Sequence, residues 1–287
     1  MKIVVLAGGL SPERNVSLST GTMVTEALRA LGHRAGLIDL YFGLETGGAD
    51  EAFFDAPVSE AYKKISREAP DLDQVRRGRK GDSPSMFGPG VLELCRMADM
   101  VFLALHGTCG EDGRVQAAFD LMGIPYTGAG YLGSAIAMDK DLTKRMVADV
   151  VSTPGWKTVT YTAADIDRLV ETARLPLVVK PVASGSSIGV SIAYTAEELR
   201  RSLTEGLALG GRTVLEEYIR GREIQVGILE DKALPSIEII PKQGFYDYAN
   251  KYQPGAALEV CPAEITPEEE ARVRAAALRV YETLGLS

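Results

Sequence analysis

The sequence predicts an α/β fold that becomes α+β in the later part of the chain. The first observation is a short apolar, β-branched run over residues 3–7 that stops at Gly8-Gly9, as a strand buried on both faces does. The second is helical spacing of apolar residues over 16–31 followed by another strand pattern over 35–40. This strand–helix–strand order predicts a parallel sheet. The third is a restart of the pattern near 153–155, which predicts a domain boundary close by.

The other elements follow in chain order. Residues 41–98 show no regular pattern, and the basic run over 76–80 is more typical of a solvated loop than of a binding patch. Before the restart we expect strands at 101–105 and 124–130 and helices at about 115–122 and 138–151. After it, the predicted strands are 158–161, 177–181, 190–193, 213–219, 222–229 and 233–240, and the predicted helices begin after Thr162, Thr195 and Thr266.

Composition excludes several classes of protein and of site. The net charge of −8 argues against a broad basic surface for nucleic acid or for anionic lipid. The three cysteines are far apart and form no CxxC pair, and only two histidines exist, so neither a disulfide framework nor a thiolate or three-histidine zinc site is expected. The first apolar run is too short for a signal peptide or a membrane span. We therefore expect a cytoplasmic protein.

A Ser/Gly loop over 184–189 follows the strand that ends near Lys180. Small residues let backbone N–H groups approach a phosphate closely, and the Lys180 ammonium could neutralise its charge. A plain hairpin turn explains the loop equally well. Lys140 lies in an amphipathic helix, where a surface lysine is the simpler interpretation. These residues alone leave the alternatives open.

Carboxylates and one histidine are the other candidates for a site. Glu216 and Glu223 could accept hydrogen bonds from ribose hydroxyls or an exocyclic amine, although solvated strand carboxylates are the simpler interpretation. Glu13 and His106 each follow a strand of the predicted parallel sheet, where ligands collect. The polar, aromatic loop over 246–252 is a candidate lid.

Eight segments in this order resemble the D-alanine–D-alanine ligases of the ATP-grasp superfamily. They cover nearly the whole chain outside residues 41–98. The segments are GGLSPERNVSLSTG at 8–21, LHGTCGEDGRVQ at 105–116, GIPYTGAG at 123–130, AMDKDLTK at 137–144, VVKPVASGSSIGVS at 178–191, VLEEYIRGREIQVGIL at 214–229, LPSIEI at 234–239 and FYDYANKY at 245–252.

The resemblance implies an N-terminal Rossmann-like domain over 1–136, a central ATP-grasp subdomain over 137–211 and a C-terminal one over 212–287. It implies ATP-dependent joining of two D-alanines through an acyl phosphate, for peptidoglycan precursor synthesis, and it also suggests a homodimer. Glu13 and His106 would bind the first D-alanine, and Glu13, Ser186 and Tyr252 would form a catalytic hydrogen-bonded set. The residues implied for ATP are Lys140, Lys180, Ser186, Ser187, Glu216, Glu217, Tyr218, Ile219, Glu223, Tyr246 and Lys251.

The resemblance also implies Mg²⁺ or Mn²⁺, but the family's Arg-x-Asp and Glu-x-Asn segments, which hold the metal, are absent up to Ser287. No metal ligand is therefore assigned, and we expect a truncated sequence rather than a metal-free enzyme. Two alternatives stay open. One is a D-alanine–D-serine or D-alanine–D-lactate ligase, and the other is a catalytically inactive nucleotide-binding protein.

Overall fold

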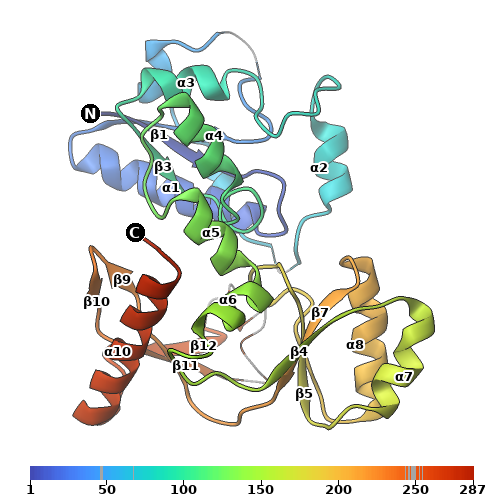
Figure 1. Cartoon of the computed structure of the whole chain (residues 1–287). Helices are drawn as coiled ribbons and strands as arrows, with labels where there is room; N and C mark the ends of the chain where they lie inside the picture. The colour runs from blue at the N-terminus through green and yellow to red at the C-terminus, as the bar shows by residue number, and fades with distance from the viewer. Residues whose placement is uncertain are drawn as a thin grey trace. The chain divides into compact units, whose positions relative to one another are not determined.

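The computed structural model describes residues 1–45, 48–66, 68–242, 244, 246, 250–251, 253 and 255–287. They form two compact units, Met1–Ala135 and Ile136–Ser287, which Figure 1 colours from blue to green and from green to red. The division of the chain into three parts stays a prediction. No helix in the described ranges is both long and apolar enough to cross a membrane.

The first unit is built on the predicted parallel sheet. Its strands are β1 (Lys2–Ala7), β2 (Arg34–Asp39) and β3 (Met100–Leu103), in the order β2-β1-β3. β1 is followed by α1 (Arg14–Ala30), as predicted. β3 ends two residues before the predicted end at 105, because Ala104 and Leu105 already belong to the loop that leads to His106. The α/β prediction for this part is confirmed.

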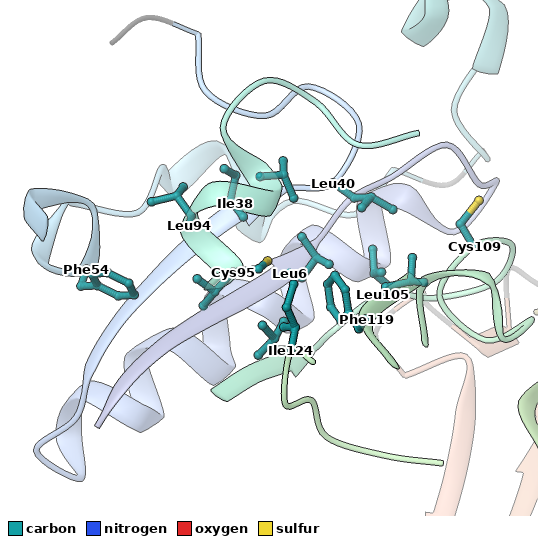
Figure 2. Close-up of a cluster of buried hydrophobic side chains, with 14 residues drawn as sticks. Leu6, Ile38, Leu40, Phe54, Leu94, Cys95, Leu105, Cys109, Phe119 and Ile124 are labelled. Carbon is teal, nitrogen blue, oxygen red and sulfur yellow. The ribbon is translucent and has the colours of Figure 1, made fainter. Parts of the chain in front are cut away.

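Apolar side chains cover both faces of this sheet. Ile3, Val5 and Ala7 alternate with Val4 and Leu6 along β1, so the two sets point to opposite faces. The first set packs against α1, and the second packs in the cluster of Figure 2, between the sheet and the helices α3 (Val91–Met97) and α4 (Arg114–Met122). Burial on both faces explains why the strand is a continuous apolar run without polar alternation.

Three sequence predictions in this unit and at its end need correction. Residues 41–98 contain η1 (Glu51–Asp55), η2 (Glu60–Lys63), α2 (Leu72–Gly78) and the buried helix α3, which had no recognisable period because it has only seven residues. The strand expected at 124–130 is reduced to one bridge between Val101 and Tyr126. The helix expected at 138–151 is shorter, α6 (Lys140–Val147), and it begins after Asp139 because the Asp139 side chain caps it by accepting from Leu142 N–H; the preceding helix α5 (Tyr131–Met138) was not predicted.

The second unit begins with an antiparallel sheet in the order β4-β7-β5-β6. Two helices pack against one face of this sheet, and the core between helices and sheet includes Val179, Leu199 and Leu203. β7 lies in the middle of this sheet although it begins at residue 212. The elements are β4 (Trp156–Thr160), η3 (Ala163–Asp165), α7 (Ile166–Glu171), β5 (Leu177–Pro181), β6 (Ser191–Ala193), α8 (Ala196–Ala208) and β7 (Arg212–Glu217).

A second antiparallel sheet follows, in the order β12-β11-β8, together with a small hairpin of β9 and β10. The strands predicted at 222–229 and 233–240 are each divided in two, because Gly227 and Pro235 interrupt them and Pro235 has no N–H to donate. Figure 1 shows α10 beside the hairpin, where the two are in contact. The elements are β8 (Glu223–Gln225), β9 (Ile228–Leu229), β10 (Lys232–Ala233), β11 (Ile237–Pro241), β12 (Ala257–Val260) and α10 (Pro267–Thr283).

Candidate functional site

The Ser/Gly loop at 184–189 is the turn between β5 and β6, which pair antiparallel. Ser186 and Ser187 both have positive φ, +50° and +59°, an uncommon conformation for residues with a side chain. Gly189 has φ +71°, and a Cβ there would lie 2.4 Å from a Leu209 methyl carbon, so only glycine fits. The loop is thus a hairpin turn of unusual backbone shape. Phosphate binding by it stays a prediction.

The two lysines predicted for phosphates reach this segment from different elements. Lys140 is the first residue of α6, and its Nζ donates to the Ser184 carbonyl at 2.7 Å while its backbone N–H donates to the Val182 carbonyl at 2.9 Å. Lys180 lies on β5, and its Nζ is 2.7 Å from Glu216 Oε1. The structure therefore brings Lys140 to the first residue of the loop and pairs Lys180 with one of the carboxylates predicted for the nucleotide.

Lys144 is a member of this group that the sequence interpretation missed. Its Nζ lies 2.8 Å from Glu216 Oε2, so one buried carboxylate stands between two ammonium groups. Lys144 follows Lys140 by four residues on the same helix, which places both on one helical face. That i, i+4 spacing was the signal available in the sequence.

A cleft of about 620 Å³ lies inside the second unit, between residues of the β4-β7-β5-β6 sheet and residues of β8 and β11. Val178, Ile192 and Ile240 contribute apolar walls, and Glu216 and Glu223 contribute acceptors. An apolar slot with a few carboxylates at its edge suits a flat heteroaromatic ring that carries hydroxyls.

The segment after β7 lines the same cleft. Glu217 pairs with Gly155, donating its backbone N–H to the glycine carbonyl at 2.8 Å. The Tyr218 ring meets Tyr194 edge-on with centroids 5.7 Å apart, and Ile219 is exposed. The predicted residues 216–219 and Glu223 are therefore gathered at one cleft.

The predicted lid is described only in part. Ser187 Oγ donates to the Tyr246 carbonyl at 2.8 Å, and the Lys251 ammonium lies 5.3 Å from the centre of the Tyr246 ring. Burial, together with nearby Glu259 and Glu223, raises the pKa of Tyr246. Tyr246 thus contacts the Ser/Gly loop, and Lys251 lies beside Tyr246. Tyr252 lies outside the described residues, so its predicted role stays untested.

In the first unit, Glu13 and His106 belong to neighbouring loops. The buried Glu13 precedes α1, and a Cβ on Gly107 (φ +70°) would lie 2.5 Å from Glu13 Oε2. Ser11 Oγ donates to the His106 carbonyl at 2.8 Å, and His106 Nε2 is 3.3 Å from Thr20 Oγ1. The structure therefore places the two residues predicted for D-alanine close together at the carboxyl ends of β1 and β3.

An ion pair holds the loop that carries Glu13. Arg14 pairs with Asp39 at the end of β2, and both side chains are less than one tenth exposed. Arg14 also donates to the Gly9 carbonyl at 2.8 Å, while the Asp39 carboxylate accepts from the backbone N–H groups of Tyr41 and Phe42. These bonds connect the β1–α1 loop to the end of β2 and hold it in place.

Glu111 is a second carboxylate at this place that the sequence interpretation missed. Its carboxylate accepts a hydrogen bond from the Gly107 N–H at 2.8 Å. Burial raises the pKa of Glu111, and the negative charge of Glu13 raises it further. The available signal was the acidic pair Glu111-Asp112 in the same glycine-rich loop as His106.

Replacing Glu111 by glutamine should change how stability depends on pH. A carboxyl with a raised pKa costs more to ionise in the folded state, so the free energy of unfolding falls as the pH rises above the ordinary value of 4.5, until Glu111 is ionised in both states. Glu111→Gln removes this loss, so the variant should gain relative to the wild type between pH 4.5 and 7. Urea unfolding at both pH values measures this, and an equal difference at the two would contradict it.

No group of three or more His, Cys, Asp or Glu side chains in the described ranges could hold a metal ion. Mg²⁺ at a nucleotide site needs only one or two protein carboxylates besides the phosphates, so the Mg²⁺ that the resemblance implies stays a prediction.

Comparison with known proteins agrees with this geometry. Residues 2–129 match the family described as "D-ala D-ala ligase N-terminus", and residues 149–287 match "D-ala D-ala ligase C-terminus". The chain is 39% identical over 291 residues to a D-alanine–D-alanine ligase of Pediococcus pentosaceus, covering all of this chain and 82% of that protein.

Two solved structures are similar over the whole chain. One is a Bacillus anthracis D-alanine–D-alanine ligase complexed with ATP (28% identity, TM-score 0.68, 79% of that chain). The other is the VanG D-Ala:D-Ser ligase of Enterococcus faecalis (28% identity, TM-score 0.69, 83% of that chain).

Proposed function

The chain belongs to the D-alanine–D-alanine ligase family, and from this premise we propose that it uses ATP to join two D-alanines. The γ-phosphoryl group passes to a carboxylate oxygen of the first D-alanine, which gives D-alanyl phosphate and ADP. The amine of the second D-alanine attacks the acyl carbon through a tetrahedral intermediate. The C–O bond to phosphate then breaks, the amine loses a proton, and D-alanyl-D-alanine and phosphate leave.

The observation that carries the nucleotide half is the cleft with Glu216 at its edge and Lys180 bonded to that carboxylate. Phosphoryl transfer depends mainly on positioning and on charge stabilisation. An adenine ring in the apolar slot would direct its phosphates toward Lys140, Lys180 and the turn of Ser186 and Ser187. Residues 217–219, which line the cleft, would border the ring, and Glu223 would accept hydrogen bonds from the ribose hydroxyls.

In the first unit, a D-alanine zwitterion needs an anion for its ammonium group. Glu13 supplies a buried carboxylate, and His106 lies in the adjacent loop. We assign the first D-alanine to these two residues. This assignment rests on the first unit alone.

Water must be excluded because an acyl phosphate hydrolyses easily. The bond between Ser187 and the Tyr246 carbonyl supports a role for the 246–252 segment in covering the phosphates, with Lys251 joining them. A catalytic role for Tyr252 stays a prediction of the resemblance.

Membership of the family also supports a role in peptidoglycan precursor synthesis in the cytoplasm, a requirement for Mg²⁺ and assembly as a homodimer. Sedimentation velocity tests the dimer, since a dimer sediments faster than a single chain. Dependence of turnover on added Mg²⁺ tests the metal requirement.

The direct test combines the protein with ATP, Mg²⁺ and D-alanine and measures phosphate release together with dipeptide formation by mass spectrometry. We expect both, in equal amounts. Parallel reactions that add D-serine or D-lactate to D-alanine distinguish the alternative ligases by the mass of the product. Tight ATP binding without phosphate release in any mixture would contradict the proposal and identify a nucleotide-binding protein without ligase activity.

A further inference from the structure

Glu216 is the centre of a three-residue charge cluster. Its two carboxylate oxygens bond different ammonium groups, Oε1 to Lys180 at 2.7 Å and Oε2 to Lys144 at 2.8 Å. The side chains of Glu216 and Lys144 are each 10% exposed, whereas Lys180 is 21% exposed. The two lysines therefore differ in their exposure to solvent.

Lys144 has no donor to spare. Besides Glu216, its Nζ bonds Thr153 Oγ1 at 2.6 Å and the Pro154 carbonyl at 3.2 Å, and an ammonium group has three hydrogens. The same ammonium lies 4.9 Å from the centre of the Trp156 ring. Lys144 is thus held in place by four neighbours and cannot turn to a ligand without breaking several contacts.

Lys180 is bound more loosely. Within the described ranges, Glu216 is the only group that hydrogen-bonds or pairs with its ammonium, which leaves two N–H donors for a ligand. Lys180 also lies four residues before Ser184, at the strand that leads into the Ser/Gly loop. It can reach a phosphate held there.

We propose that Lys144 is a positioning residue, a fixed counter-ion that keeps Glu216 compensated while Lys180 exchanges Glu216 for the phosphates of the nucleotide. The proposal rests on the proposed function only for the identity of the ligand, ATP. Glu216 itself would stay in place at the edge of the cleft throughout.

The physical reason is the cost of a buried charge without a partner. Leaving such a carboxylate unpaired is strongly unfavourable, and this cost would weaken the binding of ATP each time Lys180 moved. With Lys144 present, Glu216 keeps one ammonium partner and the exchange is nearly balanced. Without Lys144, Lys180 either stays bonded to Glu216 and does not bind the phosphates, or it leaves the Glu216 carboxylate without a partner.

A double-mutant cycle on ATP affinity tests this. We expect Lys144→Met to raise the Kd for ATP, measured by calorimetry with Mg²⁺ present, by about tenfold or more in the wild-type background. In the Glu216→Gln background, where no carboxylate needs compensation, the same change should raise it by less than about threefold. Lys157→Met, on exposed β4 surface, is the matched control and should leave the Kd unchanged.

Equal losses in both backgrounds would mean that Lys144 acts only through packing and would overturn the proposal. No loss in either background would overturn it as well. Because the cycle measures binding, it tests the role of Lys144 even if the protein binds ATP but makes no dipeptide. In that case the proposed ligase activity would be wrong, and the role of Lys144 would still be settled by the Kd values.

A second measurement needs no change at Lys144. In protein with ¹⁵N-labelled lysines, buried and bonded ammonium groups give separate signals, and the Lys180 signal is the one lost in Lys180→Met. Addition of ATP should shift the Lys180 signal and leave the other bonded ammonium signal of the cluster in place. Movement of both signals, or of neither, would contradict the exchange.

Discussion

Replacing Lys180 by methionine should lower kcat/KM for ATP about 10²- to 10³-fold, the largest loss we expect from a single change in the second unit. The variant keeps the apolar stem of the side chain but removes the ammonium that we expect to exchange Glu216 for the phosphates. Lys144 cannot replace it, because all of its donors are engaged. Steady-state ADP release with saturating D-alanine measures the effect.

Two controls distinguish lost charge from lost folding. Lys157→Met makes the same exchange on an exposed position of β4 and should retain full activity. The melting temperature of Lys180→Met should stay close to that of the wild type, because Glu216 keeps its bond to Lys144. A loss of less than about tenfold in kcat/KM would remove Lys180 from the phosphate site.

Glu13→Gln should raise the KM for the first D-alanine by about 10²-fold while the Kd for ATP stays the same. The change is isosteric, so the contacts of Glu13 with the neighbouring loop are retained in shape. What is lost is the buried negative charge, and pairing of a buried charge with an ammonium contributes a few kcal/mol to binding. Initial rates over a range of D-alanine concentrations, with ATP affinity measured separately, give both values.

Glu26 is the matched control for this change. It lies on α1, the helix that Glu13 precedes, but is exposed and pairs with Lys63 at the surface. Glu26→Gln should alter neither KM nor kcat. A normal KM for D-alanine in Glu13→Gln would show that another group binds the ammonium, and Glu111 in the neighbouring loop would be the next residue to change.

The elements that sequence reasoning predicted well are those whose signal is local. β1 is a continuous apolar run because both of its faces are buried, and β5 was predicted with its observed ends at 177 and 181. α8 and α10 begin directly after Thr195 and Thr266, because each threonine and the glutamate three residues later accept hydrogen bonds from each other's backbone N–H groups.

The features that were missed depend on partners far away in the sequence. α3 is too short to show a period, and its place is fixed by packing against β1. Lys144 resembles any helical lysine until β7 brings Glu216 to it, and Glu111 resembles a solvated acid until the Gly107 backbone bonds it. Periodicity describes one element at a time, so it cannot reveal such pairs.

The pairing of Arg14 with Asp39 has a consequence for the binding of the D-alanine that we assign to the first unit. Because both charges are nearly sealed from solvent and bond the backbone around them, the loop bearing Glu13 has its shape before any ligand arrives. A molecule as small as an amino acid makes few contacts, so its binding energy could not offset the entropy cost of ordering a flexible loop. Folding of the chain therefore fixes the β1–α1 loop before the ligand binds, and binding then costs little further conformational entropy of this loop.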